Sequence, residues 1–183
     1  MSGSADSLFA RIAEQADGDL PPVHRWHPTE VADPGMRISR DGTWWYQGSP
    51  IRRQRMVRLF SRVLRREGPD YFLVTPVEKV RVEVEAAPLL AVRMEVRQGE
   101  GGQDIAFQTN TGDIVVADRE HPIRVHGCDD APLPVVVVRD GIEALIARNI
   151  YYELVELGEV LCVGDQQTLT VRSGGAIFEL GKL

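Results

Sequence analysis

Residues 77–85 read Val-Glu-Lys-Val-Arg-Val-Glu-Val-Glu, a regular alternation of valine with charged side chains. Successive side chains of a β-strand point to opposite faces of its sheet. Val80, Val82 and Val84 would therefore share one face, and the charged residues would share the other. This pattern is typical of an antiparallel strand with one face on the core and one face in water. The stretch predicts a half-buried sheet.

The residues before this strand predict a helix flanked by strands. Residues 43–47 are rich in aromatic side chains and favour a strand. Ser49 suits the N-cap of a helix, and residues 51–67 carry the apolar periodicity of that helix. Residues 71–75 predict a short strand before the alternating one. An irregular arm is expected over residues 23–40.

A similar order of elements recurs later in the chain. Residues 135–138 predict a strand, and Asp140 with Glu143 form a capping box for a helix over residues 142–157. Two strands follow this helix. Both stretches read strand, helix, strand, strand, which predicts an internal duplication. The alternative is that a common order of elements occurs twice by chance.

The repeat predicts an α+β fold with two small domains. A short amphipathic helix is expected over residues 7–16. We predict an N-terminal helix and arm over residues 1–22, an α+β domain over 23–86, and a second α+β domain over 87–183. A ligand site is expected between the two domains, because interfaces between domains are preferred positions for such sites.

Composition limits the function classes. The chain has 183 residues, of which 43% are hydrophobic and 26% charged, so we expect a packed core. A formal net charge of −6 disfavours binding to a nucleic-acid polymer. No apolar run approaches the ~20 residues that span a bilayer, and the N-terminus lacks a signal-peptide pattern. Cys128 and Cys162 form no CxxC pair, which is typical of free thiols in a reducing compartment. The sequence therefore predicts a cytoplasmic protein without a membrane partner.

The arginines of the helix predicted over residues 51–67 fall into two groups. Five of them share a polar face that is expected to be solvated: Arg55, Arg58, Arg62, Arg65 and Arg66. Arg52 and Arg53 instead fall in the first turn, where cations oppose the helix dipole. A bound phosphate or carboxylate would offset that cost, because free N–H groups and two guanidinium groups would converge on it. An acidic side chain such as Glu78 would do the same.

The remaining polar residues give little evidence of chemistry. Asn149 lies at the edge of the apolar face of the helix predicted over residues 142–157, where it needs a backbone or ligand partner if buried. His121, His126 and Cys128 match no zinc spacing. No P-loop, GxSxG or GxGxxG motif is present. We therefore predict no catalytic residue, no metal site and no cofactor.

Several strings of residues together resemble an uncharacterised bacterial family, domain of unknown function 1285. They are Trp45-Tyr46-Gln47-Gly48-Ser49-Pro50-Ile51, Phe72-Leu73-Val74-Thr75-Pro76-Val77-Glu78-Lys79, Arg148-Asn149-Ile150-Tyr151-Tyr152, and the ending Ser173-Gly174-Gly175 to Phe178-Glu179-Leu180-Gly181. The resemblance covers most of the chain beyond Leu20. It implies two α+β domains with a repeated motif and a C-terminal domain like a pleckstrin-homology antiparallel barrel. It also implies a nucleotide-like ligand between the domains and a role in signal transduction.

The resemblance adds Thr75, Glu78 and Lys79 as candidate interface residues, the alternative being a role in turn and strand pairing. We expect a non-enzymatic module that binds a small anionic, nucleotide-like ligand, with an aromatic ring such as Tyr46 or Tyr152 stacking on a base. The candidate ligand-binding residues are Ser49, Arg52, Arg53, Thr75, Glu78, Lys79, Asn149 and Tyr152. The alternative is a protein-interaction adaptor, in which the barrel-like C-terminal domain accepts a partner strand at an exposed sheet edge. A hydrolase is the third hypothesis.

Overall fold

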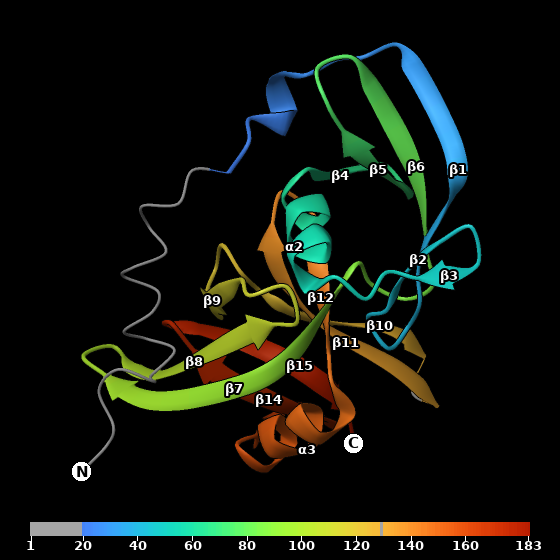
Figure 1. Cartoon of the computed structure of the whole chain (residues 1–183). Helices are drawn as coiled ribbons and strands as arrows, with labels where there is room; N and C mark the ends of the chain where they lie inside the picture. Colours follow the sequence, from blue (N-terminus) through green and yellow to red (C-terminus); the bar gives the residue numbers. More distant parts are fainter. Residues whose placement is uncertain (1–19, 129) are drawn as a thin grey trace.

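The computed structural model describes residues 20–128 and 130–183, which form three sheets, two α-helices and one short 3-10 helix (Figure 1). The 3-10 helix, η1, spans Val23–Arg25. The helix predicted over residues 7–16 lies outside the described residues. No helix within the described ranges is long and apolar enough to cross a membrane.

The first sheet has six strands in the order β3-β2-β1-β6-β5-β4. The strands are β1 (Glu30–Ile38), β2 (Trp44–Tyr46), β3 (Ser49–Pro50), β4 (Leu64–Glu67), β5 (Asp70–Val74) and β6 (Glu78–Val84). Neighbouring strands are antiparallel except β1 and β6, which pair in parallel at the centre. Helix α2 (Gln54–Arg62) follows β3, and its Phe60 ring lies 6.1 Å from the Trp44 ring of β2.

The second sheet has six strands in the order β10-β11-β12-β7-β8-β9, and the third has the order β13-β14-β15. The strands of the second sheet are β7 (Leu89–Gly99), β8 (Gly102–Thr109), β9 (Ile114–Val116), β10 (Ile123–Cys128), β11 (Ala131–Arg139) and β12 (Ile142–Ile146). Helix α3 (Arg148–Glu156) leads into the third sheet, which comprises β13 (Glu159–Val163), β14 (Gln166–Ser173) and β15 (Ala176–Lys182).

The two six-stranded sheets have the same connectivity. In each, three consecutive strands form one antiparallel meander and the next three form a second, and the first strand pairs in parallel with the sixth. The first sheet ends at β6 and the second begins at β7, so each sheet comes from one continuous half of the chain. The structure therefore contains a repeated arrangement, but it is one of six strands.

One buried core joins both halves. The cluster includes Ile38 and Trp44 from the first sheet and Leu89 and Phe107 from the second, all 1% exposed or less. Leu154 of α3 is also fully buried within it. The core therefore runs across the predicted boundary at residue 86, and the division into 23–86 and 87–183 stays a prediction.

The alternating stretch that predicted a sheet is strand β6. Val82 is 3% exposed while its neighbours Arg81 and Glu83 are exposed, as the period-two pattern requires. The strand is antiparallel to β5 but parallel to β1. The irregular arm predicted over residues 23–40 is wrong in its second part, since β1 occupies it.

Both predicted helices are too long. Helix α2 ends at Arg62, and residues 64–67 form β4, which turns back into β5 through Gly68 at φ 60°. A glycine with positive φ at the first position of a two-residue turn is typical of a β-hairpin. Ser49 pairs with Tyr46 in the β2–β3 ladder, so it is not the N-cap, which is Arg53.

The capping box predicted at Asp140 is wrong. Asp140 and Gly141 have φ values of 38° and 77° and form the tight turn between β11 and β12. Positive φ at both central residues is the requirement of a type I′ hairpin turn, for which Asp-Gly is a preferred sequence. Glu143 consequently lies in β12, and only Arg148–Glu156 of the predicted helix is helical.

The finer parts of the predicted fold class are not confirmed. The strand–helix–strand–strand motif does not recur with the predicted bounds, because part of each predicted helix is a strand. The strands of the described residues form three open sheets and no closed barrel, so the likeness to a pleckstrin-homology barrel is not observed. The coarser prediction is confirmed: the chain has two parts, is mostly sheet and has few helices.

Candidate functional site: an arginine-lined cleft between the two halves

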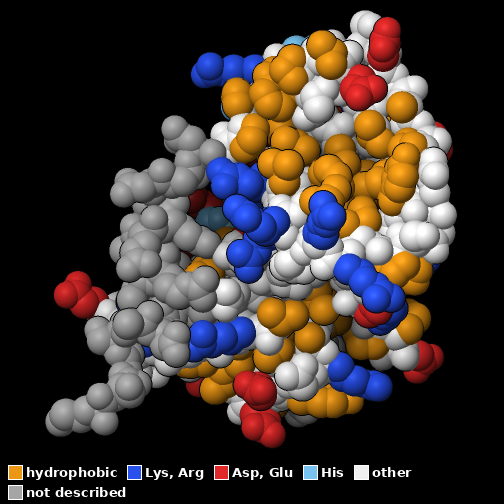
Figure 2. All heavy atoms as spheres, in the orientation of Figure 1, with side chains coloured by type: hydrophobic (Ala, Val, Ile, Leu, Met, Phe, Trp, Pro, Cys, Tyr) orange, Lys and Arg blue, Asp and Glu red, His pale blue; other side chains and the backbone are white. Residues whose placement is uncertain are grey.

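A cleft of about 440 Å³ lies where the two halves meet. Its lining comes from the chain before β1, from the end of α2 and β4, and from the β11–β12 turn: Leu20, Pro21, Pro22, Val23, His24, Arg62, Leu64, Arg65, Arg66, Arg139, Asp140 and Ile142. Four of these residues are arginines, and one, Asp140, is a carboxylate. In Figure 2, Lys and Arg side chains gather around the position of α2.

Arg65 fixes one wall of the cleft. Its Nη1 donates to the carbonyl oxygens of Val23 at 2.8 Å and Trp26 at 2.6 Å, which anchors η1 to β4. Its Nε donates to Glu67 Oε1 at 3.0 Å. With a side chain only 18% exposed, Arg65 is held by partners on several sides. Arg65 therefore has a structural role in addition to its charge.

Arg139 fixes the opposite wall and joins the two halves. Its Nη1 donates to Asp113 Oδ1 at 2.7 Å, and its Nη2 donates to the Ser61 carbonyl oxygen at 2.6 Å. Ser61 belongs to the last turn of α2, where carbonyl groups lack helical partners. Because the Arg139 side chain is 14% exposed, these bonds are largely shielded from water. The guanidinium group thus ties β11 to the first half.

Arg62 and Arg66 are the more exposed arginines of the cleft. Arg66 Nε donates to the Gly68 carbonyl oxygen at 2.9 Å, and its guanidinium carbon lies 5.7 Å from the centre of the Tyr71 ring. Its Nη1 lies 3.4 Å from the Gly141 carbonyl oxygen in the other half. Arg66 can turn toward a ligand at less structural cost than Arg65 or Arg139, because its side chain is 38% exposed against 18% and 14% for theirs.

A buried carboxylate lies beside the cleft. Glu143 is 7% exposed, and its oxygens lie 3.1 and 3.2 Å from His126 Nε2, 3.6 Å from Arg124 and 3.9 Å from Arg66. Burial of a charged group is costly unless it is paired. Glu143 therefore explains why several basic side chains converge here. Burial raises the pKa of the nearby Tyr71 hydroxyl above 10.0, an effect that Arg66 opposes and Glu143 reinforces.

The chemistry of the cleft suits an anion. Guanidinium groups bind phosphate and carboxylate groups through paired N–H donors and keep their charge at every physiological pH. No three His, Cys, Asp or Glu side chains gather as metal ligands within the described ranges. Cys128 and Cys162 are exposed and unbonded. The arrangement of the cleft supplies binding groups for an anion.

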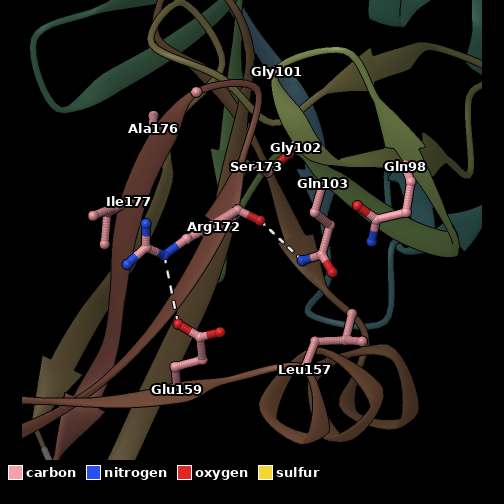
Figure 3. A pocket seen from close by; sticks show the side chains of 11 residues that line it. Gln98, Gly101, Gly102, Gln103, Leu157, Glu159, Arg172, Ser173, Ala176 and Ile177 are labelled. Carbon is pink, nitrogen blue, oxygen red and sulfur yellow. Dashed lines mark hydrogen bonds and ion pairs between the residues drawn. The ribbon is translucent and has the colours of Figure 1, made fainter.

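A second cavity of about 520 Å³ lies between the β7–β8 turn, the β14–β15 turn and the start of β13 (Figure 3). Gln103 Nε2 donates to the Arg172 carbonyl oxygen at 3.0 Å, and Arg172 Nε lies 3.5 Å from Glu159 Oε2. The one arginine of this cavity is therefore paired with a carboxylate that also lines it. This cavity carries no excess of positive charge and is a weaker candidate for an anion.

The structure places the predicted site residues in three separate regions, none of which lines the arginine cleft. Ser49, Arg52 and Arg53 are exposed on the edge strand β3 and the segment before α2. Two strands, β2 and β1, separate this edge from β6, which carries Lys79. The predicted meeting of these residues with Lys79 around one anion is therefore not found.

Thr75, Glu78 and Lys79 lie together at the β5–β6 turn. The Thr75 hydroxyl oxygen accepts from the Glu78 amide at 3.1 Å and donates to the Glu78 carbonyl oxygen at 3.0 Å, so it closes the turn. Lys79 Nζ lies 2.6 Å from Glu67 Oε2 and 4.5 Å from the centre of the Phe72 ring. The bond to Lys79 is the main cause that lowers the pKa of Glu67 below 4.5. These contacts fit the alternative role of the three residues, which is turn and strand pairing.

Asn149 and Tyr152 lie on α3, and both are exposed. The Tyr152 ring is 57% exposed, lies 6.0 Å from the guanidinium carbon of Arg148, and lines a separate cavity of about 650 Å³. Tyr46, on β2, is 45% exposed. The two candidate stacking rings therefore belong to different regions of the molecule.

The comparisons with known proteins agree with the sequence resemblance. The N-terminal domain model of the domain of unknown function DUF1285 matches residues 21–87, and the C-terminal domain model of the same family matches residues 88–180. No curated protein matches the chain.

Two solved structures are similar to this chain. The crystal structure of a DUF1285 family protein from Silicibacter pomeroyi DSS-3 is 43% identical, covers 98% of this chain and 97% of its own, and has a TM-score of 0.81. One from Shewanella baltica OS155 is 31% identical, covers 67% of this chain and 91% of its own, and has a TM-score of 0.54. Matching family models over both halves, together with close identity over almost the whole chain, show that this protein belongs to the DUF1285 family.

Proposed function

We propose that this protein is a non-enzymatic module that binds a small phosphate-bearing, nucleotide-like anion in the arginine-lined cleft. The observation that supports it is the convergence of Arg62, Arg65 and Arg66 from the first half with Arg139 from the second. A ligand there would contact both halves at once. This arrangement suits a signalling role, because a bound ligand would stabilise the contact between two parts of one chain.

The size and charge of the cleft support a small ligand. A volume of about 440 Å³ falls in the range of roughly 300–1,000 Å³ typical of small-molecule sites. Arg65 and Arg139 are already ordered by their own partners, so their charges are preorganised and cost little entropy on binding. Leu64 and Ile142 provide apolar contact beside the charges. The combination fits a phosphate joined to a less polar group.

The test compares two double variants with the same change in charge. Arg62→Gln with Arg66→Gln alters the cleft, whereas Arg52→Gln with Arg53→Gln alters exposed arginines outside it. Each protein is titrated with ATP, cyclic di-GMP and pyrophosphate by calorimetry and by thermal shift at 150 mM salt. We expect the cleft variant to lose at least ten-fold in affinity for the ligand that binds the wild type.

The matched variant makes the result decisive. If the Arg52 and Arg53 variant loses affinity and the cleft variant does not, the ligand binds at the edge of α2 and the cleft assignment is wrong. If none of the three ligands shifts the wild-type melting temperature, the anion-binding function is refuted for this class. A ligand at 100 times its Kd would add about 2.7 kcal/mol of stability, which such an assay resolves.

A protein-interaction adaptor is the second candidate. It is favoured by two apolar side chains exposed on α2, Met56 at 40% and Leu59 at 59%. Exposed apolar groups on one helix face are typical of a docking surface. Leu59→Lys separates the two candidates, because it should leave the anion affinity unchanged. An adaptor without a ligand would show no thermal shift with any of the three anions.

A further inference from the structure

The outer strands of the three sheets differ in how their free edges are covered. At the ends of the sheets, β10 and β15 contact one another, and β4 contacts η1 and β12. Strand β3 has only two residues, and β9 has three, of which Ile114 and Val115 are buried. Strand β13 has five residues, and β14 is its one substantial neighbour within the described part of the chain. Its free edge is therefore the longest one that remains open.

The residues of β13 are unusual for an open edge. Glu159, Val160, Leu161 and Cys162 are all exposed, with Val160 at 52% and Leu161 at 37%. Natural edge strands are normally protected by lysine, proline or a β-bulge. Residues 159–163 contain neither lysine nor proline, and their register with β14 is unbroken. The strand is thus an unprotected, largely apolar edge that can pair with another strand.

The register shows which backbone groups are free. A two-residue turn, Gly164-Asp165, joins β13 to β14, and residues 163 and 166 form the closing pair. In such a hairpin the closing pair is hydrogen-bonded, and hydrogen-bonded pairs alternate along the ladder. The N–H and C=O groups of Val160 and Cys162 consequently point away from β14. They are the groups available to a partner strand.

We propose that β13 pairs antiparallel with β13 of a second copy of this chain, about a two-fold axis at Leu161. This register places Val160 of each copy opposite Cys162 of the other, so the free groups meet and form four hydrogen bonds between the chains. Glu159 lies opposite residue 163, which is valine, so no like charges face each other. The two three-stranded sheets become one sheet of six strands.

The self-complementarity of β13 is the reason to choose a second copy as the occupant. In an isologous two-fold contact the same surface of each copy faces its counterpart, so that surface must be compatible with itself. Strand β13 meets this condition, because it is short and apolar and has one carboxylate, at its first residue. One pair of five-residue strands buries less than the roughly 1,200 Å² typical of stable interfaces. The dimer is therefore weak, and forms at high micromolar protein concentration.

Cysteine cross-linking tests the register. In a Cys128→Ser, Cys162→Ser background, Leu161→Cys places two thiols directly opposite each other, at the roughly 4.5 Å Cα separation of a non-hydrogen-bonded pair. Val160→Cys is the matched control, because residue 160 of each copy lies more than roughly 7 Å from residue 160 of the other. We expect at least ten-fold more disulfide-linked dimer with Leu161→Cys under mild oxidation.

Light scattering across a concentration series tests the association without a cross-link. Leu161→Lys should raise the dimer dissociation constant at least ten-fold, because two lysines would face each other at the axis. Ile177→Lys is the control, since Ile177 is 50% exposed on β15 of the same sheet and lies outside the contact. A wild type that stays monomeric at 1 mM overturns the proposal. Equal cross-linking of both cysteine variants also overturns it, because it would reflect random collision.

Discussion

The loss of one hydroxyl group should destabilise the second half of the protein strongly. Ser173 is fully buried at the end of β14. Its Oγ accepts from the Ile105 amide at 2.8 Å and donates to the Ala117 carbonyl oxygen at 2.7 Å. Both partners are also fully buried, so Ser173→Ala leaves one backbone donor and one backbone acceptor without partners and away from water. The hydroxyl joins the third sheet to the second.

The magnitude follows from the two orphaned groups. An unsatisfied buried donor or acceptor costs about 1–3 kcal/mol, so two of them cost roughly 2–6 kcal/mol. A methyl group in place of a hydroxyl recovers only a small part of this by apolar burial. We expect a loss of about 3 kcal/mol, which for a chain of this size corresponds to a fall in melting temperature of roughly 6–12 °C. Ser49→Ala, at an exposed serine, should change stability by less than about 0.5 kcal/mol.

Urea unfolding measured by two probes makes this prediction specific. All three tryptophans, Trp26, Trp44 and Trp45, lie in the first half, so their fluorescence reports that half, while circular dichroism reports every sheet. With one continuous core, both transitions should shift together with an unchanged slope. A loss below about 1 kcal/mol would refute the reasoning. Separate transitions would show that the two halves unfold independently.

Three further changes test other contacts, each by urea unfolding. Glu67→Gln should cost about 0.5–1 kcal/mol at pH 7, because Lys79 lowers the pKa of this partly exposed carboxyl in the folded protein. That stability is present above 4.5 and is lost as the pH falls through the lowered pKa, so the difference between wild type and variant should shrink on acidification, and a constant difference would contradict the ion pair. Gly174→Ala should destabilise the protein by at least about 1 kcal/mol more than Gly48→Ala, because both glycines have positive φ but only at Gly174 would the new Cβ lie 2.7 Å from a backbone oxygen. Equal losses of stability would show that the turn at Gly174 relaxes around the methyl group. Arg139→Met should cost about 2–3 kcal/mol, because it breaks the hydrogen bond to Asp113 within the second half and the hydrogen bond to Ser61 of the first half. An effect within about 0.5 kcal/mol would show that water replaces these bonds.

The strands with a strong local pattern were the predictable part of the fold. In β6 the burial of one face imposes a period of two, and the valines report it directly. The aromatic run at residues 44–46 behaves in the same way, because Trp44 is buried at the centre of the core and favours extended backbone. The parallel pairing of β1 with β6 could not be predicted, since it joins segments more than 40 residues apart without a local signal.

The helices were overextended because two hairpin turns were interpreted as helix boundaries. Gly68-Pro69 and Asp140-Gly141 are both two-residue turns between antiparallel strands, and both have sequences that favour such turns. Each true helix has only nine residues, so its periodicity covers about two turns. Over so short a stretch, helical spacing can continue by chance into a strand. Here the turn chemistry carried more information than the periodicity.

The same error concealed the arginine cleft. On a helix, Arg62, Arg65 and Arg66 share one face and would be solvated. In the structure Arg65 and Arg66 belong to a strand, where consecutive side chains point to opposite sides. Arg65 therefore reaches η1 while Arg66 reaches the turn after Arg139. Arg139 comes from the other half, so only the tertiary structure brings the four together.

The connection between the halves bears on how a ligand would act. Only residues 85–88 separate β6 from β7, and Ala87 and Pro88 within them are buried. Glu85 accepts a hydrogen bond from the Arg40 amide at 2.9 Å, which holds the connection to the first sheet. Hinge motion between domains needs an exposed linker with few contacts. This connection has the opposite character, so we expect the cleft to bind its ligand without closure.

Small-angle scattering tests that expectation. A compact chain of 183 residues should have a radius of gyration of roughly 16 Å. A saturating anion that binds the cleft should raise the melting temperature and leave this radius unchanged within about 0.5 Å, because the halves share one core. A decrease of more than about 1 Å would mean that the halves close on the ligand. In that case the continuous core would not prevent the two halves from moving, and ligand binding would be signalled by a change in the shape of the protein rather than in its stability.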